Sequence, residues 1–327
     1  MARSLGITYA SLTSLGLNGG LDVARTAEQL GYDNYWTAET TGAESFTYLM
    51  AAHHVAPTLG LGTGIIPIQL RTPGLAAMSA ATLQALAPDC EILLGVGISS
   101  PVVAGQWHGA EYSSRPVAQM REYLTLVREM LTGEQVTFDG DFYHVKRFKL
   151  GVRLGERRPR LVLAALNERM LRLGGELADG VLLNYLPAGH VPWAVGQIRE
   201  GGAAKVYAYV HAGVVEDREK GYELARRDIY SYAVVDGYAR QFSAAGFSDE
   251  IADMKARQAA GDRDGAVRAI SNRMADAIDF MGDHREVARF ITTYRHAGVD
   301  VPVLMPMPWG PDRMAVTTAT MAAAADQ

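Results

Sequence analysis

Apolar segments alternate with amphipathic segments along the whole chain. Eight short segments are almost continuously apolar, and most are followed by a longer stretch in which apolar residues recur at helical spacing. The apolar segments are residues 4–10, 33–39, 59–66, 90–97, 159–165, 179–186, 204–214 and 301–307. The helical segments include residues 21–31, 44–56, 73–87, 115–131, 167–178, 190–200 and 311–325. This order predicts eight strands that alternate with helices.

Eight strand–helix units are typical of a (β/α)8 TIM barrel, an α/β fold with a closed parallel sheet. The alternative, an open doubly wound sheet, usually has fewer strands and a glycine fingerprint after its first strand, which this chain lacks. Two connections are unusually long. One follows the fourth strand and includes a hairpin at residues 136–145, and the other is a mostly helical stretch at residues 217–297. We expect both to be insertions on one barrel domain formed by residues 1–327.

Composition and charge narrow the functional classes. The chain has 327 residues, of which 48% are hydrophobic and 20% charged, as in an ordinary globular protein. Its net charge of −5 argues against a broad nucleic-acid surface. The single cysteine, Cys90, cannot form an internal disulfide, which suits a reducing compartment. No signal-peptide core or membrane-length apolar run is present. We therefore expect a cytoplasmic protein without membrane or nucleic-acid partners.

The ends of the predicted strands are where a barrel places its active site. Glu39 ends the second strand and Asn184 ends the sixth. The third strand contains Gly60, Gly62 and Gly64, although glycine weakens a strand unless some backbone must approach closely there. We interpret this stretch as a strand-to-loop corner that faces a ligand.

Two further strand ends lead into predicted helix starts. Ser99 and Ser100 precede Pro101, so they either only cap a helix or also turn their backbone amides toward a pocket. Asn167 is a predicted N-cap, and the amides that follow it form an end that attracts phosphate. Arg169 lies on that first turn; from these residues alone, simple capping with a solvated arginine is the more economical interpretation.

The sequence lacks the motifs of several classes of enzyme and metal site. No spacing of His, Cys, Asp and Glu resembles a zinc site, so no metal is predicted. A GXSXG elbow and a Walker loop are also absent, which disfavours hydrolases and kinases. Glu39 and His108 are the candidate catalytic residues, since a strand-end carboxylate and a loop histidine can both move protons. Trp36 is expected to be a core residue.

Five sequence blocks together resemble the bacterial luciferase-like superfamily, in the branch that uses coenzyme F420, a 5-deazaflavin. The blocks are WTAE, LGTGIIPIQLRTP, LLGVGISSPVVAGQWHG, RPVAQMREYLTLVREML and LAALNERMLRLGGELADG. The resemblance covers roughly residues 4 to 200 and fades through the helical stretch. It implies an oxidoreductase that transfers a hydride between the deazaflavin and a small organic substrate of a specialised pathway.

The resemblance also implies roles for individual residues. The third strand would end in a bulge with a cis Gly64–Ile65 peptide behind the central ring of the cofactor, and Glu39 would lie beside the ring. Asn184 would face the substrate. The remaining implied cofactor-binding residues are Pro67, Ser99, Ser100 and Val103 around the ring, and Ala165, Leu166, Asn167, Arg169 and Met170 at the phosphate. Relatives form homodimers, so a homodimer is expected.

Two departures separate this chain from the sugar-phosphate dehydrogenases of the same group. Thr40 stands where they have a histidine, and Ser100 stands where they have a glutamate. Oxidation of a sugar phosphate is therefore disfavoured, and the proton-handling group is left open between Glu39 and His108. The alternative activity is that of a monooxygenase using reduced flavin mononucleotide (FMN) and oxygen. A cofactor-carrying binding protein without turnover is the alternative from another class.

Overall fold

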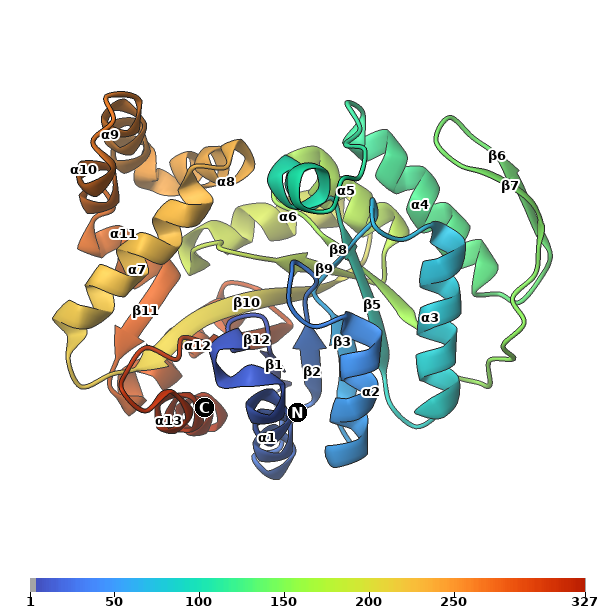
Figure 1. Cartoon of the computed structure of the whole chain (residues 1–327), viewed down its shortest axis with the longest axis horizontal. Helices are drawn as coiled ribbons and strands as arrows, with labels where there is room; N and C mark the ends of the chain where they lie inside the picture. The colour runs from blue at the N-terminus through green and yellow to red at the C-terminus, as the bar shows by residue number, and fades with distance from the viewer. Residues whose placement is uncertain (1–3, 327) are drawn as a thin grey trace.

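Eight parallel strands close into a barrel (Figure 1). These strands are β1 (Gly6–Thr8), β2 (Asn34–Thr37), β3 (Gly60–Thr63), β5 (Ile92–Gly97), β8 (Arg160–Ala164), β9 (Gly180–Leu183), β10 (Lys205–Val214) and β12 (Val301–Pro306). Each pairs with its successor, and β12 pairs with β1. The predicted TIM barrel is confirmed. The computed structural model describes residues 4–326, so residues 1–3 and 327 of the predicted domain lie outside the described part.

Helices cover the outside of the barrel. They are α1 (Gly16–Gln29), α2 (Ser45–Val55), α3 (Pro73–Leu86), α4 (Pro116–Met130), α5 (Glu168–Leu177), α6 (Val191–Gly201), α12 (His284–His296) and α13 (Arg313–Ala325). Short helical turns are η1 (Thr13–Leu15), η2 (Pro101–Trp107) and η3 (Ala188–His190). Local signals start several helices; for example, Asp283 and Glu286 form a capping box on α12. Within residues 4–326, no helix is both long and apolar enough to cross a membrane.

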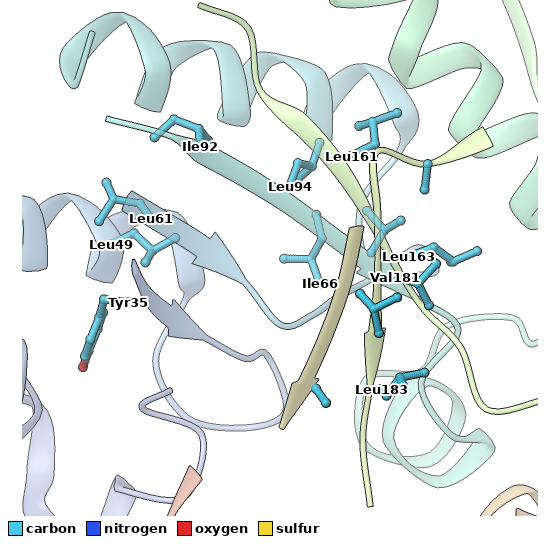
Figure 2. Close-up of a cluster of buried hydrophobic side chains, with 14 of the residues drawn as sticks. Tyr35, Leu49, Leu61, Ile66, Ile92, Leu94, Leu161, Leu163, Val181 and Leu183 are labelled. Carbon is cyan, nitrogen blue, oxygen red and sulfur yellow. The ribbon is translucent and has the colours of Figure 1, made fainter. Parts of the chain in front are cut away.

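Alternation along the strands divides the apolar residues into two cores. Outward side chains pack under the helices, as Figure 2 shows for Leu61, Leu94 and Leu163. Inward side chains fill the barrel, and the predicted core residue Trp36 is fully buried among them. A Cβ added at Gly62 would lie 2.5 Å from the Trp36 ring. The glycine therefore makes room for this indole, so its place in a strand is explained by internal packing rather than by a ligand.

The first insertion is a hairpin outside α4. Its strands, β6 (Val136–Asp139) and β7 (His144–Phe148), pair antiparallel. The backbone amide of Gly140 donates to the carbonyl of Tyr143 at 3.0 Å, which closes the loop at residues 140–143. This hairpin agrees with the prediction, and it lies at the far side of the barrel from the second insertion (Figure 1).

The second insertion stands beside the mouth of the barrel. It contains α7 (Arg218–Ala233), α8 (Asp236–Phe242), η4 (Ser243–Phe247), α9 (Ser248–Ala259), α10 (Arg263–Arg268) and α11 (Asn272–Ile278). The prediction of mostly helix here missed β11 (Asp279–Gly282), which pairs with the end of β10. Four residues directly after a helix are too few to give a strand period. The predicted range also contained α12, which is a helix of the barrel itself.

Candidate active site

The predicted site residues gather at the carboxyl end of the barrel. Because all the strands are parallel, every strand ends at the same rim. Glu39 follows β2, Gly64 and Ile65 follow β3, Ser99 and Ser100 follow β5, Leu166 and Asn167 follow β8, and Asn184 follows β9. Between them lie the half-buried Ala10, Ile65 and Ala164, which pack on top of the barrel core. These apolar side chains form the layer of the core that is closest to the rim.

The corner after β3 is fixed from inside the barrel. The Gly64–Ile65 peptide bond is cis, the geometry that the resemblance implies here. Tyr209 donates its hydroxyl to the carbonyl of Gly64 at 2.9 Å, and a Cβ at Gly64 would lie 1.9 Å from that hydroxyl. The chain then continues as β4 (Ile66–Pro67), which pairs with β5. Pro67 is buried in this pairing, whereas Ile65 is half-buried at the rim.

Glu39 is held by a residue that sequence reasoning missed. Its carboxylate lies 2.9 Å from the guanidinium of Arg71 and accepts from the backbone amide of Ser45 at 3.1 Å. The side chains of Glu39 and Arg71 are only 12% and 14% exposed. Burial acts to lower the pKa of Arg71, but the bonds to Glu39 and Glu44 outweigh it and raise that pKa. The contacts with Arg71 and Ser45 hold the Glu39 carboxylate in one position, so this side chain is fixed at the rim.

His108 is brought to the same part of the rim. Its Nε2 lies 2.5 Å from the carbonyl oxygen of Thr40, the residue after Glu39. A carbonyl oxygen only accepts, so Nε2 carries the hydrogen in this contact. The histidine follows η2, whose first turn is capped by Ser100: its hydroxyl accepts from the backbone amide of Val103 at 3.1 Å. The structure therefore brings the two candidate catalytic residues onto neighbouring loops.

The start of α5 has free hydrogen-bond donors. Asn167 caps the helix as predicted, accepting from the amide of Met170 at 3.3 Å. Among the described residues, the amides of Glu168 and Arg169 and the exposed guanidinium of Arg169 have no hydrogen-bond or ion-pair partner. Arg172 instead pairs with two glutamates. An exposed helix start with free amides and one unpaired cation is suited to an anion.

The other predicted residues on this segment are less accessible. Ala165 and Met170 are buried, and Leu166 is half-buried. The amide of Ala165 donates to the carbonyl of Leu182 at 3.2 Å, so this residue belongs to the wall of the barrel. The neighbouring rim residues Ser99 and Tyr185 have positive φ angles of 59° and 50°. Non-glycine residues in this conformation are uncommon and gather at functional sites.

A buried polar cluster on the insertion side was not expected from the sequence. Asn184, at the rim, contacts His211 of β10, and His211 contacts Asp279 of β11. Asp228 of α7 accepts from the Tyr185 hydroxyl at 2.7 Å. Burial lowers the pKa of His211, and it raises the pKa of both carboxyls. The only signal in the sequence is one histidine at an inward position of an apolar strand.

Comparison with known proteins identifies the family. The profile of the luciferase-like monooxygenase family matches residues 6–301. The chain belongs to this family, as its sequence blocks indicated.

Individual relatives carry more specific names. The 5,10-methylenetetrahydromethanopterin reductase of Archaeoglobus fulgidus is 25% identical over 88% of this chain and 89% of its own length. The F420-dependent glucose-6-phosphate dehydrogenase of Intrasporangium calvum is 30% identical over 53% of this chain and 55% of its own. Among solved structures, the coenzyme F420-dependent tetrahydromethanopterin reductase of Methanopyrus kandleri superposes with a TM-score of 0.77 at 19% identity. That superposition covers 99% of this chain and 98% of that one.

Proposed function

We propose that this protein is a coenzyme F420-dependent oxidoreductase that transfers a hydride between the deazaflavin and a small organic substrate. The observation that carries the proposal is the exposed start of α5, with its free amides and Arg169, on the same rim as the corner at Gly64 and Ile65. These features fit a cofactor with a flat ring and an acidic tail. Sequence relatives that are named as F420-dependent enzymes support the same choice.

Different residues of the chain would bind the phosphate, the ring and the substrate. The side chain of Arg169 and the backbone amides of Glu168 and Arg169 would hold the phosphate. Asn167 caps the same helix. Ile65 and its neighbours at the top of the core would support the ring from behind, because they are half-buried and apolar. When bound, the deazaflavin supplies the hydride chemistry. The substrate would lie on the exposed face of the ring, toward Asn184.

Binding of the oxidised cofactor tests the proposal. Tag-free protein is titrated with F420 and, separately, with FMN, and binding is followed by fluorescence. We expect F420 to bind at least tenfold more tightly. The Arg169→Ala variant should lose about tenfold in F420 affinity, roughly 1.4 kcal/mol, and Arg172→Ala is the matched control because its cation is already paired. Tight FMN binding without F420 binding overturns the proposal and favours the monooxygenase.

His108 is proposed as the group that handles the proton, with Glu39 as the anchored anion beside it. Of the two, only His108 has an exposed side chain, whereas Glu39 is paired with Arg71. A general acid contributes about 10²–10⁴-fold to the rate. The His108→Phe variant should therefore lose about 100-fold in kcat and one limb of its pH–rate profile. An unchanged profile removes His108 from this role.

A homodimer is proposed from the resemblance and from one exposed face. Leu75, Met78 and Leu86 lie at helical spacing on α3 and are 44%, 48% and 59% exposed. An apolar stripe of this kind on an alanine-rich helix suits packing against a second copy. The wild type should elute as a dimer on size-exclusion chromatography, and Met78→Glu should give a monomer. A monomeric wild type contradicts the proposal.

A further inference from the structure

Three side chains with metal-binding atoms meet between the barrel and the second insertion. His211 and Asp279 are register partners on the adjacent parallel strands β10 and β11, so their side chains lie next to each other. Asp228 approaches from α7. One ligand atom from each of the three residues lies within 4.8 Å of the others. Two atoms that both bind one ion at about 2.0–2.2 Å lie no more than about 4.4 Å apart. The 3.0 Å between Nδ1 of His211 and Oδ1 of Asp279 fits this limit, and a pair near 4.8 Å has to close by a few tenths of an ångström when the ion binds.

Two of these side chains are buried and the third, Asp228, is half-buried, and no lysine or arginine of the described residues balances their charge. The side chains of His211 and Asp279 are 1% and 0% exposed. No backbone amide and no cationic side chain of residues 4–326 donates to Asp279, whose polar contacts are with His211 and with the carboxyl of Asp228. No lysine or arginine of residues 4–326 forms an ion pair with Asp228 or Asp279. Buried carboxylates are normally paired or bound to a metal ion.

The hydrogen bond on the other side of the imidazole fixes its orientation. The side-chain amide of Asn184 donates through Nδ2 to the Tyr238 hydroxyl at 3.2 Å. Its Oδ1 therefore accepts from Nε2 of His211, at 3.1 Å. The neutral ring then turns the lone pair of Nδ1 toward Oδ1 of Asp279, 3.0 Å away. Two lone pairs at this distance repel each other unless a positive centre lies between them.

We propose that Nδ1 of His211 and the carboxylates of Asp228 and Asp279 bind one divalent first-row transition-metal ion. A doubly charged ion balances the two carboxylates. Imidazole and carboxylate without thiolate suit zinc, manganese, iron or cobalt rather than copper(I), and the imidazole disfavours magnesium. Because the ligands come from β10, α7 and β11, the ion ties the insertion to the barrel.

The residues around the three ligands fit this assignment. A metal-binding histidine usually donates its second ring hydrogen to a neighbouring acceptor, which fixes the ring. The Oδ1 atom of Asn184 provides that acceptor, and the Tyr185 hydroxyl orients the Asp228 carboxylate in the same way. Through His211 the ion also fixes Asn184, a residue of the barrel rim. None of the three ligands is among the residues proposed to bind the cofactor, so the metal site can be tested independently of the proposed activity.

The test measures metal directly on the protein. Tag-free protein is dialysed against a chelator and then titrated with Co²⁺, followed by visible absorption, and with Zn²⁺, followed by calorimetry and by Tm. We expect one equivalent of each ion to bind and Zn²⁺ to raise Tm, with Mg²⁺ having much less effect. A wild type that binds neither Co²⁺ nor Zn²⁺ at this stoichiometry overturns the proposal and leaves protons as the balancing charge.

Variants locate the ion. Asp279→Asn keeps the volume of the side chain and should weaken Co²⁺ binding at least tenfold, and Tyr185→Phe should weaken it about tenfold through lost orientation. Asp276→Asn is the matched control, because this carboxylate belongs to the same insertion but accepts from Arg218 and Tyr222. Circular dichroism checks that each variant is folded. Equal Co²⁺ affinity in the wild type and in folded Asp279→Asn contradicts the assignment.

Discussion

The two sides of the barrel mouth differ in whether a buried carboxylate has a cationic partner. On the side of β2 and β3, the carboxylate of Glu39 is matched by Arg71, and the corner at Gly64 is fixed by Tyr209. On the side of β10 and β11, Asp279 is more deeply buried and has no cationic partner among the described residues. The first side is therefore complete by itself, whereas the second requires a proton or an ion. This difference separates a self-contained scaffold from a region whose state depends on what it binds.

The largest expected effect comes from filling the space at Gly64. A valine Cβ there would clash with the hydroxyl of Tyr209 at 1.9 Å, and Leu182 is also close. Overpacking of this kind costs about 1–3 kcal/mol, so Gly64→Val should lower the free energy of unfolding by that amount and abolish F420 binding. Urea unfolding and the fluorescence titration measure the two effects.

Gly155→Val is the matched control for this change. Gly155 is exposed, and a Cβ there meets no atom within 4 Å. It should leave both stability and binding unchanged. If Gly64→Val behaves like this control, the corner is not packed as described, and the first side of the mouth is less rigid than the comparison requires.

Removing Arg71 should make the first side resemble the second. Arg71→Ala leaves Glu39 largely buried and without its cation. Breaking a buried pair costs 3–5 kcal/mol and an exposed pair up to about 1 kcal/mol, so we expect about 1–3 kcal/mol here, by urea unfolding. Glu39→Gln in the Arg71→Ala background should recover part of the loss, because the unpaired charge is gone.

The control for Arg71 is an exposed pair on α1. The side chains of Arg25 and Asp22 are 48% and 59% exposed. Arg25→Ala should therefore cost less than about 0.5 kcal/mol. No recovery in the Arg71→Ala, Glu39→Gln double variant would mean that Arg71 acts by packing on Phe46, 5.0 Å from its ring centroid, rather than by charge.

The sequence predicted the parts of the site that depend on local chemistry. Asn167 and Ser100 were expected to start helices, and both do so by accepting a backbone amide three residues later. The eight strands were found for a similar reason, because each carries its own apolar pattern. These features are decided within a few neighbouring residues.

The parts that were missed depend on contacts between distant segments. Arg71 meets Glu39 across 32 positions of the chain, after the corner that follows β3 has turned. Asp279 meets His211 only because β11 adds to the end of β10. A search for metal-ligand spacing also could not find this cluster, since its three residues are separated by 17 and 51 positions, that is 228 − 211 and 279 − 228. Such sites are visible only once the fold is known.

The smallest expected effect concerns the pH dependence of the first side. Glu44 caps α2 by accepting from the amides of Phe46 and Thr47, and it also contacts Arg71. Burial acts to raise the pKa of Glu44, but these hydrogen bonds outweigh it and lower that pKa below 4.5. A carboxyl with a lowered folded-state pKa stabilises the protein above its unfolded-state pKa, and this contribution is lost as the pH falls through the folded-state value. The Glu44 side chain is 45% exposed and glutamine keeps an accepting oxygen, so Glu44→Gln should cost only about 0.2–0.5 kcal/mol at neutral pH and less at the acidic end of the stability curve. A cost that is independent of pH would show that the cap acts through its shape alone, and the contrast between the two sides would then rest on Arg71 and Glu39.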